Sequence, residues 1–122
     1  MRLKKGKRDK LALGNLDASR DWGHSKDYVR AMHMIINHKE AGDWTVATGE
    51  SRTIRDMCKI TFELLGMNYE DYVTVDSKYF RPHELNFLKG DSSEIRNVLG
   101  WKPEYTFDSM VEEMVNHWMD IV

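Results

Sequence analysis

Two arginines and one glutamate lie in turn-rich stretches, where their side chains could bind a ligand. Arg20 lies in the polar stretch 14–28 (GNLDASRDWGHSKDY), and Arg81 and Glu84 flank a proline in the segment 78–85 (KYFRPHEL). A guanidinium on a rigid turn suits a phosphate, and a carboxylate suits a vicinal diol. The two stretches could therefore converge on a diphosphate and a ribose. Internal salt bridges that pin each loop would account for the same arginines.

The stretch 14–28 is too polar for a core strand and too rich in turn-forming residues for a helix. We therefore expect a loop that leads into a helix. Within it, Asp17 and Asp21 are expected to brace the turn, Trp22 to shape it, and Asp27 to begin the following helix.

Motifs for catalysis or cofactor binding do not occur in the sequence. No two of the eight glycines have the spacing of a Gly-rich dinucleotide-binding turn, and no tyrosine is followed by a lysine four residues on. The histidines and the single cysteine, Cys58, form no zinc-binding pattern, and no Gly-x-Ser-x-Gly motif occurs. We therefore expect no catalytic, cofactor-binding or metal-binding residue in these 122 residues.

Composition and charge favour an ordinary globular protein. The net charge is −2, and 41% of the residues are hydrophobic. Residues 1–10 contain six Lys or Arg and one Asp, so a basic arm that binds nucleic acid is one alternative, although no aromatic residue is interleaved with the charges. With one cysteine, no visible signal peptide and no long apolar run, we expect a cytoplasmic protein without a membrane segment.

The apolar periodicity predicts a mixed α/β, helix-rich fold. The predicted elements are a strand at 10–16, a helix from Asp27 that stops at Gly42, a strand at 44–48, a helix from a Thr53–Asp56 capping box to Gly66, a strand at 72–76, a short helix from 91–94 to Gly100, and a helix from Thr106 through Trp118. Because the apolar stripes are wide and the strands few and short, we expect some helical surface to lack a partner within this chain and to drive self-association.

Four segments together resemble the GDP-mannose 4,6-dehydratase family, a branch of the extended short-chain dehydrogenases. They are LGNLDASRDWGHSKDYV (13–29), VATGES (46–51), VDSKYFRPHEL (75–85) and GDSSEIRNVLGWKP (90–103). The resemblance runs in order through essentially the whole chain but covers only the C-terminal third of such an enzyme. It implies one partial domain at 1–122, with a strand and substrate loop at 1–25 and a helical substrate-binding subdomain with short strands at 26–122, lacking most of the N-terminal Rossmann domain.

The resemblance implies that the whole enzyme uses NADP to convert GDP-mannose to GDP-4-keto-6-deoxymannose, a precursor of GDP-fucose. It implies that Arg20 contacts the diphosphate, and that Arg81 and Glu84 contact the phosphate and ribose. Leu13, Gly14 and Asn15 would lie along the nucleotide through their backbone. The full-length family would form homo-oligomers.

The resemblance leaves the role of the chain by itself open. We expect a substrate-binding portion that is inactive alone, from a truncated or split gene product or an excised domain. A GDP-sugar-binding remnant without catalysis, or half of a split enzyme that complements a separate N-terminal Rossmann chain, is the alternative. A module that binds nucleic acid through the basic N-terminal arm is a more remote alternative.

Overall fold

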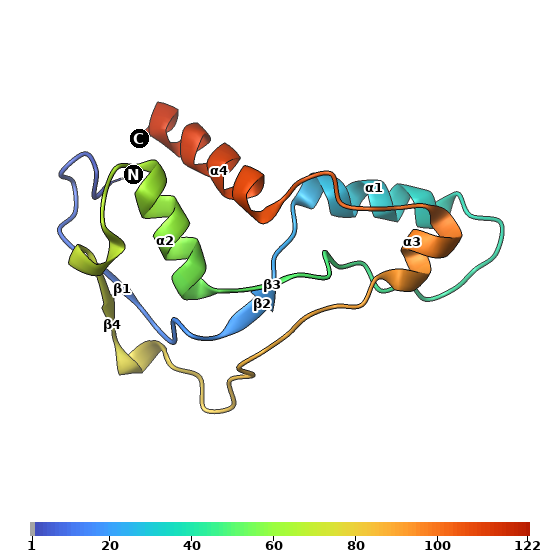
Figure 1. Ribbon diagram of the computed structural model, residues 1–122, viewed down its shortest axis with the longest axis horizontal. Helices are drawn as coiled ribbons and strands as arrows, with labels where there is room; N and C mark the ends of the chain where they lie inside the picture. Colours follow the sequence, from blue (N-terminus) through green and yellow to red (C-terminus); the bar gives the residue numbers. More distant parts are fainter. Residues whose placement is uncertain (1) are drawn as a thin grey trace.

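The computed structural model describes residues 2–122, and helices make up most of its regular secondary structure (Figure 1). The helices are α1 (Ser25–Ile36), α2 (Ile54–Leu64), α3 (Ser93–Leu99) and α4 (Phe107–Ile121), and the strands are β1 (Leu11–Leu13), β2 (Ser19–Asp21), β3 (Ser51–Thr53) and β4 (Val73–Val75). Short 3-10 helices lie at Tyr69–Asp71 and Ser77–Tyr79. The mixed, helix-rich α/β fold expected from the sequence is confirmed.

The strands form two separate pairs. β1 and β4 are parallel, with Leu11 opposite Val73, and β2 and β3 are antiparallel, with Arg20 opposite Arg52. The β1–β4 pair lies with α2 and α4 at one end of the elongated molecule, whereas α1 and α3 lie at the other (Figure 1). The β2–β3 pair lies between the two ends.

The predicted starts of α2 and α4 are confirmed, and both helices begin with a capping box. The Thr53 hydroxyl accepts a hydrogen bond from the Asp56 amide, and the Asp56 carboxylate accepts one from the Thr53 amide. Thr106 and Ser109 form the same reciprocal arrangement at α4. Each arrangement satisfies backbone donors that the first helical turn leaves free. α3 ends at Gly100 as predicted, and this residue adopts a left-handed φ of 72°.

Two predictions about the segment after α1 are wrong. The helix ends at Ile36 rather than at Gly42, because Asn37 leaves the helical conformation at φ −89° and ψ 0°, and its side-chain amide caps the last turn by donating to the His33 carbonyl at 2.8 Å. The predicted strand at 44–48 is not assigned as a strand. No backbone group of residues 44–47 has a hydrogen-bond partner within the described residues 2–122, so the β-forming sequence finds no neighbouring strand there.

The expectation that residues 14–28 form only a loop is also incomplete, because β2 lies inside it. β2 pairs with β3 on one side. On its other side the Ser19 amide donates to the Asn86 carbonyl at 2.7 Å, and the Ser19 carbonyl accepts from the Leu88 amide at 3.0 Å. Long-range backbone pairing therefore makes a strand from residues whose polarity alone argues against one.

Two apolar clusters form the core. Leu65, Phe107, Met110, Val111 and Val115 pack between α2 and α4. Ala31, Ile95 and Trp101 form the second cluster, between α1 and α3. The molecule thus has two small cores, one at each end, in place of one large core.

A buried carboxylate organises the second core. Asp27 is almost fully buried, and its two carboxylate oxygens accept hydrogen bonds from the backbone amides of Glu104 and Tyr105 at 2.9 and 3.2 Å. The Trp101 indole N–H donates to the Asp27 carbonyl at 2.9 Å, and Arg30 lies 3.4 Å from the carboxylate. The prediction that Asp27 begins the helix is wrong, because α1 begins at Ser25 and His24 is its N-cap. Asp27 instead joins the first turn of α1 to the turn that precedes α4.

Candidate functional site

The structure brings Arg20 and Glu84 together across 64 residues of sequence. Arg20 lies on β2, and its Nη2 forms an ion pair with Glu84 Oε1. The other terminal nitrogen, Nη1, donates to the Leu85 carbonyl at 2.6 Å and to the Ser19 carbonyl at 2.8 Å. Both side chains of the pair are largely screened from solvent, with 24% and 20% exposed. Arg20 thus makes an internal salt bridge that holds the 84–85 turn against β2.

Arg81 also lies beside the Glu84 carboxylate, but its side chain is much more exposed to solvent than that of Arg20. Its Nε is 3.9 Å from Glu84 Oε2, and its side chain is 82% exposed. The Glu84 carboxylate therefore lies between two guanidinium groups, one fixed and one exposed to solvent. Such a pair of guanidinia suits an anion with several oxygens, such as a diphosphate.

Leu13 is the last residue of β1, and Gly14 and Asn15 follow it, beside the segment that follows β4. The Leu13 carbonyl accepts a hydrogen bond from the Asp76 amide at 2.8 Å. A Cβ at Gly14 would come within 2.8 Å of the Tyr79 carbonyl oxygen, so a side chain there would clash with backbone. Because β1 and β4 are parallel, residues 13–15 and 76–79 meet at the carboxyl edge of the pair, the edge where open α/β sheets bind ligands.

Asp21, next to Arg20, joins β2 to two other segments, residues 48–49 and the backbone at Gly90. Its carboxylate accepts hydrogen bonds from the amides of Thr48, Gly49 and Gly90 at 2.9 to 3.1 Å and from the Thr48 hydroxyl at 2.7 Å. Burial by itself raises the pKa of Asp21, but these hydrogen bonds outweigh it and leave the pKa below its ordinary value. Asp21 therefore braces the loop, as predicted.

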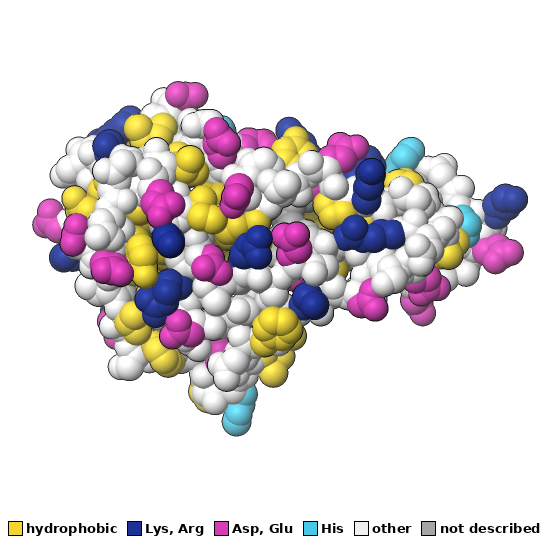
Figure 2. All heavy atoms as spheres, viewed as in Figure 1, with side chains coloured by type: hydrophobic (Ala, Val, Ile, Leu, Met, Phe, Trp, Pro, Cys, Tyr) yellow, Lys and Arg dark blue, Asp and Glu magenta, His cyan; other side chains and the backbone are white. Residues whose placement is uncertain are grey.

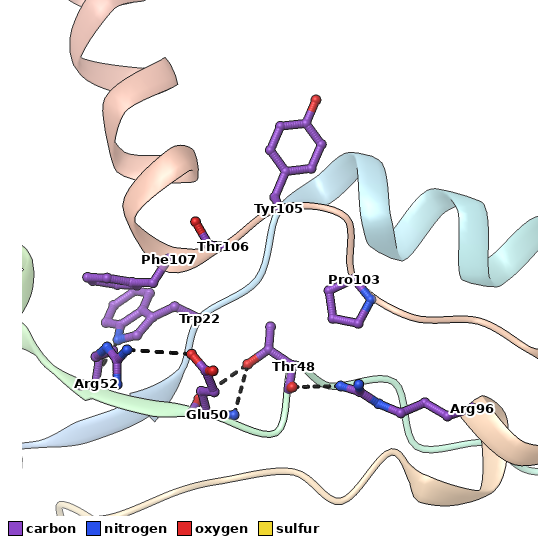
Figure 3. A pocket seen from close by; sticks show the side chains of 9 residues that line it. All are labelled: Trp22, Thr48, Glu50, Arg52, Arg96, Pro103, Tyr105, Thr106 and Phe107. Atoms are coloured by element: carbon purple, nitrogen blue, oxygen red, sulfur yellow. Dashed lines mark hydrogen bonds and ion pairs between the residues drawn. The ribbon is translucent and has the colours of Figure 1, made fainter.

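A hollow that the sequence did not reveal lies apart from Arg20, Arg81 and Glu84, none of which lines it. It has a volume of about 200 Å³ and is lined by side chains that include Trp22, Arg52 and Arg96 (Figure 3). Its arginines are already engaged, since Arg52 pairs with Glu50 at 3.5 Å and Arg96 donates to the Thr48 carbonyl at 2.7 Å. These residues come from separate segments without a shared motif, so no local signal could have identified the hollow.

The basic N-terminal segment has a structural role. Lys5 and Lys7 donate to the carbonyls of Met119 and Val122 at the end of α4, at 3.2 and 3.4 Å. Cations are favourable at this negative end of a helix dipole. On the face shown in Figure 2, basic and acidic side chains are interspersed instead of forming one basic surface. These contacts account for part of the charge run without nucleic acid.

The described residues give little support for a reactive cysteine or a metal site. Burial raises the pKa of the Cys58 thiol, which keeps it protonated and unreactive. Within residues 2–122 no cluster of three or more His, Cys, Asp or Glu could hold a metal ion. No helix in this part of the chain has the length and apolar character needed to cross a membrane.

Solved structures place this fold in a known class. The structure of RMD from Pseudomonas aeruginosa complexed with NADPH matches with a TM-score of 0.87 and 25% identity, over 99% of this chain and 40% of that one. The UDP-glucose 4-epimerase of Bifidobacterium longum, solved with NAD+ and UDP, matches with a TM-score of 0.80 and 19% identity, over 98% and 37% of the two chains. The fold is that of one part of the nucleotide-sugar epimerases and dehydratases.

Sequence comparison narrows the class to one family. The family model for GDP-mannose 4,6 dehydratase matches residues 1–114. GDP-mannose 4,6 dehydratase 2 of Arabidopsis thaliana is 44% identical over 120 residues, which are 98% of this chain and 32% of that protein. The Homo sapiens GDP-mannose 4,6 dehydratase is 39% identical over 128 residues, covering 91% of this chain and 34% of that protein. This chain belongs to the GDP-mannose 4,6-dehydratase family, and it spans about a third of the length of these relatives.

Proposed function

We propose that this chain forms the nucleotide-sugar-binding part of a GDP-mannose 4,6-dehydratase. The convergence of Arg20, Arg81 and Glu84 is the observation that carries this proposal. The two guanidinia bind the diphosphate of GDP-mannose, and Glu84 accepts hydrogen bonds from the ribose hydroxyls. Leu13, Gly14 and Asn15 lie along the nucleotide through their backbone.

The contribution of this chain to the reaction is binding and orientation. Fixing the diphosphate and ribose at one end restricts the position of the mannose ring, and positioning of this kind lowers the entropic cost of a reaction. The sequence offers neither a Gly-rich turn for a dinucleotide nor a Tyr-x-x-x-Lys pair. NADP and the acid–base groups would therefore be held by residues outside this chain, so we expect the chain alone to show no turnover.

Calorimetric titration with GDP-mannose tests the proposed site. Arg20→Ala and Arg81→Ala should each weaken binding by about 1.5–3 kcal/mol, the usual value of a hydrogen bond to a charged group. Arg8→Ala, at an exposed position of the N-terminal segment, is the matched control and should leave affinity unchanged. Unchanged affinity in both site variants would remove the assignment.

A second candidate is a role as one half of a two-chain enzyme, completed by a separate Rossmann chain. Two features at the α1 end favour it. Val29, Met32 and Ile36 form an exposed apolar face on α1, with Ile36 80% exposed. The segment 44–47 that follows is β-forming in sequence, and its backbone lacks a partner within the described residues. A sheet with an open edge would satisfy both features, since it offers a strand partner and an apolar surface.

Co-purification tests this second candidate. The chain should bind the part of the Arabidopsis thaliana relative that its own 120 matched residues do not cover. Met32→Glu, on the exposed α1 face, should abolish the complex, whereas Asn97→Glu, at an exposed position of α3, should not. A complex that survives Met32→Glu, or no complex at all, would contradict it.

A further inference from the structure

The Glu84 carboxylate occupies the position in which an anion would contact both arginines of the candidate site. One of its oxygens pairs with Arg20 Nη2, and the other lies 3.9 Å from Arg81 Nε. A carboxylate and a phosphate present similar acceptor oxygens to a guanidinium fork. Glu84 therefore stands in for a ligand anion within the chain itself.

Arg20 would keep its position if Glu84 moved away. Its Nη1 is bound to the carbonyls of Ser19 and Leu85. The backbone of Ser19 is in turn paired with β3 on one side and with the 86–88 segment on the other. These neutral acceptors fix the guanidinium without neutralising its charge. Release of Glu84 would thus expose a preorganised Nη2 edge to an incoming anion.

Glu84 is placed so that it can move. It lies outside any helix or strand, in the turn-rich segment between Ser77–Tyr79 and α3. Rotation of its side chain therefore breaks no hydrogen bond of a helix or sheet. What restrains the carboxylate is its attraction to the two arginines, and a more highly charged anion competes directly with that attraction.

We infer that Glu84 is an internal competitor that makes this site selective for ligands combining a diphosphate with a vicinal diol. The inference rests on the proposed function and deepens it. A bare diphosphate must displace the carboxylate from Arg20 and leave it without a new partner. A nucleoside diphosphate displaces it in the same way but supplies two ribose hydroxyls that the released carboxylate can accept from. Selection thus comes from a repulsive element as well as an attractive one.

Titrations of Glu84→Gln with inorganic pyrophosphate and with GDP test the competition. Gln keeps the shape of the side chain but removes its charge, so pyrophosphate should bind about fivefold tighter than to the unmodified chain. GDP should gain less or lose affinity, because a neutral amide oxygen is a weaker acceptor for the diol. Glu112→Gln, at an exposed position on α4, makes the same charge change away from the site and should alter neither affinity.

A second comparison isolates the diol. GDP should bind the unmodified chain more tightly than 2′,3′-dideoxy-GDP, and this preference should disappear in Glu84→Gln. Glu84→Asp, which keeps the charge on a shorter side chain, should lie between the two proteins for pyrophosphate and also guards against a folding defect of the Gln variant.

The outcomes separate the inference from the proposed function. Failure of the unmodified chain to bind GDP would remove the proposed function, yet a gain of pyrophosphate binding in Glu84→Gln would still support the competition. If neither Glu84→Gln nor Glu84→Asp changes pyrophosphate binding, undetectable binding throughout included, the inference is wrong.

Discussion

The two ends of the molecule are held together in different ways. At the α2–α4 end, an apolar cluster packs between two helices, each begun by its own capping box. At the α1–α3 end, a smaller cluster depends on one buried carboxylate that reaches the backbone 77 and 78 residues away. The first end is specified by local sequence and apolar packing, and the second by a long-range polar contact.

The ends also differ in what they leave uncovered. The α1–α3 end has the exposed face of Val29, Met32 and Ile36 and the unpaired segment 44–47. Its Trp44 indole nitrogen is buried without a hydrogen-bond partner in the described residues. A buried unpaired donor costs free energy. The α2–α4 end exposes apolar side chains too, among them Met114, Trp118 and Ile121. The unpaired backbone of 44–47 and the buried indole donor are therefore what set the α1–α3 end apart.

The largest loss of stability is expected when the polar contact at the α1–α3 end is broken. Asp27→Asn should lower the free energy of unfolding by about 3 kcal/mol, because an amide carries no charge and turns an N–H₂ toward backbone donors. Urea unfolding followed by the fluorescence of the four tryptophans, of which Trp101 is fully buried, measures this loss. Asp43→Asn, at an exposed position, is the control. Equal stability of the two variants would show that Asp27 does not organise this end.

Smaller effects are expected at the α2–α4 end. Thr53→Ala and Thr106→Ala should each cost about 1 kcal/mol, the usual value of an N-cap. Since each variant breaks one local cap and leaves the apolar cluster in place, the two losses should be nearly additive in the double variant. A loss from either Thr substitution as large as that from Asp27→Asn would contradict the contrast between the two ends.

The free energy of unfolding is expected to depend on pH through Asp21, which lies between the two ends of the molecule. The pKa of Asp21 is lowered by its hydrogen bonds, so its contribution to stability is present above the unfolded pKa, near 3.8. This contribution is lost as the pH falls through the lower pKa of the folded state. Urea unfolding between pH 6 and about pH 2.5 should show the decline, and Asp21→Asn should flatten it. If Asp21→Asn keeps the same decline in stability at low pH, Asp21 is not the group responsible for that decline.

The smallest effect on stability is expected from the exposed α1 face. Met32→Glu should change the free energy of unfolding by no more than about 0.5 kcal/mol, as is usual at exposed positions. It should nevertheless reduce self-association in sedimentation velocity, because it places a charge in an exposed apolar face. If the unmodified chain sediments as a monomer and melts cooperatively, the exposed α1 face does not drive self-association.

The sequence predicted those features that local chemistry decides. Thr53 and Thr106 begin α2 and α4, and Gly100 ends α3, as predicted, whereas the glycine stop predicted at Gly42 does not end α1. Pairing between distant segments was harder to predict. β2 forms because the backbones of β3 and residues 86–88 flank it, and residues 44–48 form no strand because no such neighbour is present among the described residues. Strand propensity is decided by these neighbours more than by the residue itself.

The candidate site was predictable only as a set of residues. Arg20, Arg81 and Glu84 could be chosen by residue type and turn context, and the structure places them together. The sequence could not show that Glu84 lies between the two arginines, because that arrangement depends on the 84–85 turn packing against β2. The roles of these residues toward a ligand remain predictions.

The side-chain Nε–H resonances of the arginines, followed by NMR during a GDP titration, test the central claim most directly. The account predicts that the Arg20 and Arg81 signals shift along one saturation curve, while those of Arg52 and Arg96, which line the hollow beside Trp22, stay in place. Shifts confined to Arg52 and Arg96, or no shift at any of the four, would contradict a nucleoside-diphosphate site between Arg20 and Arg81.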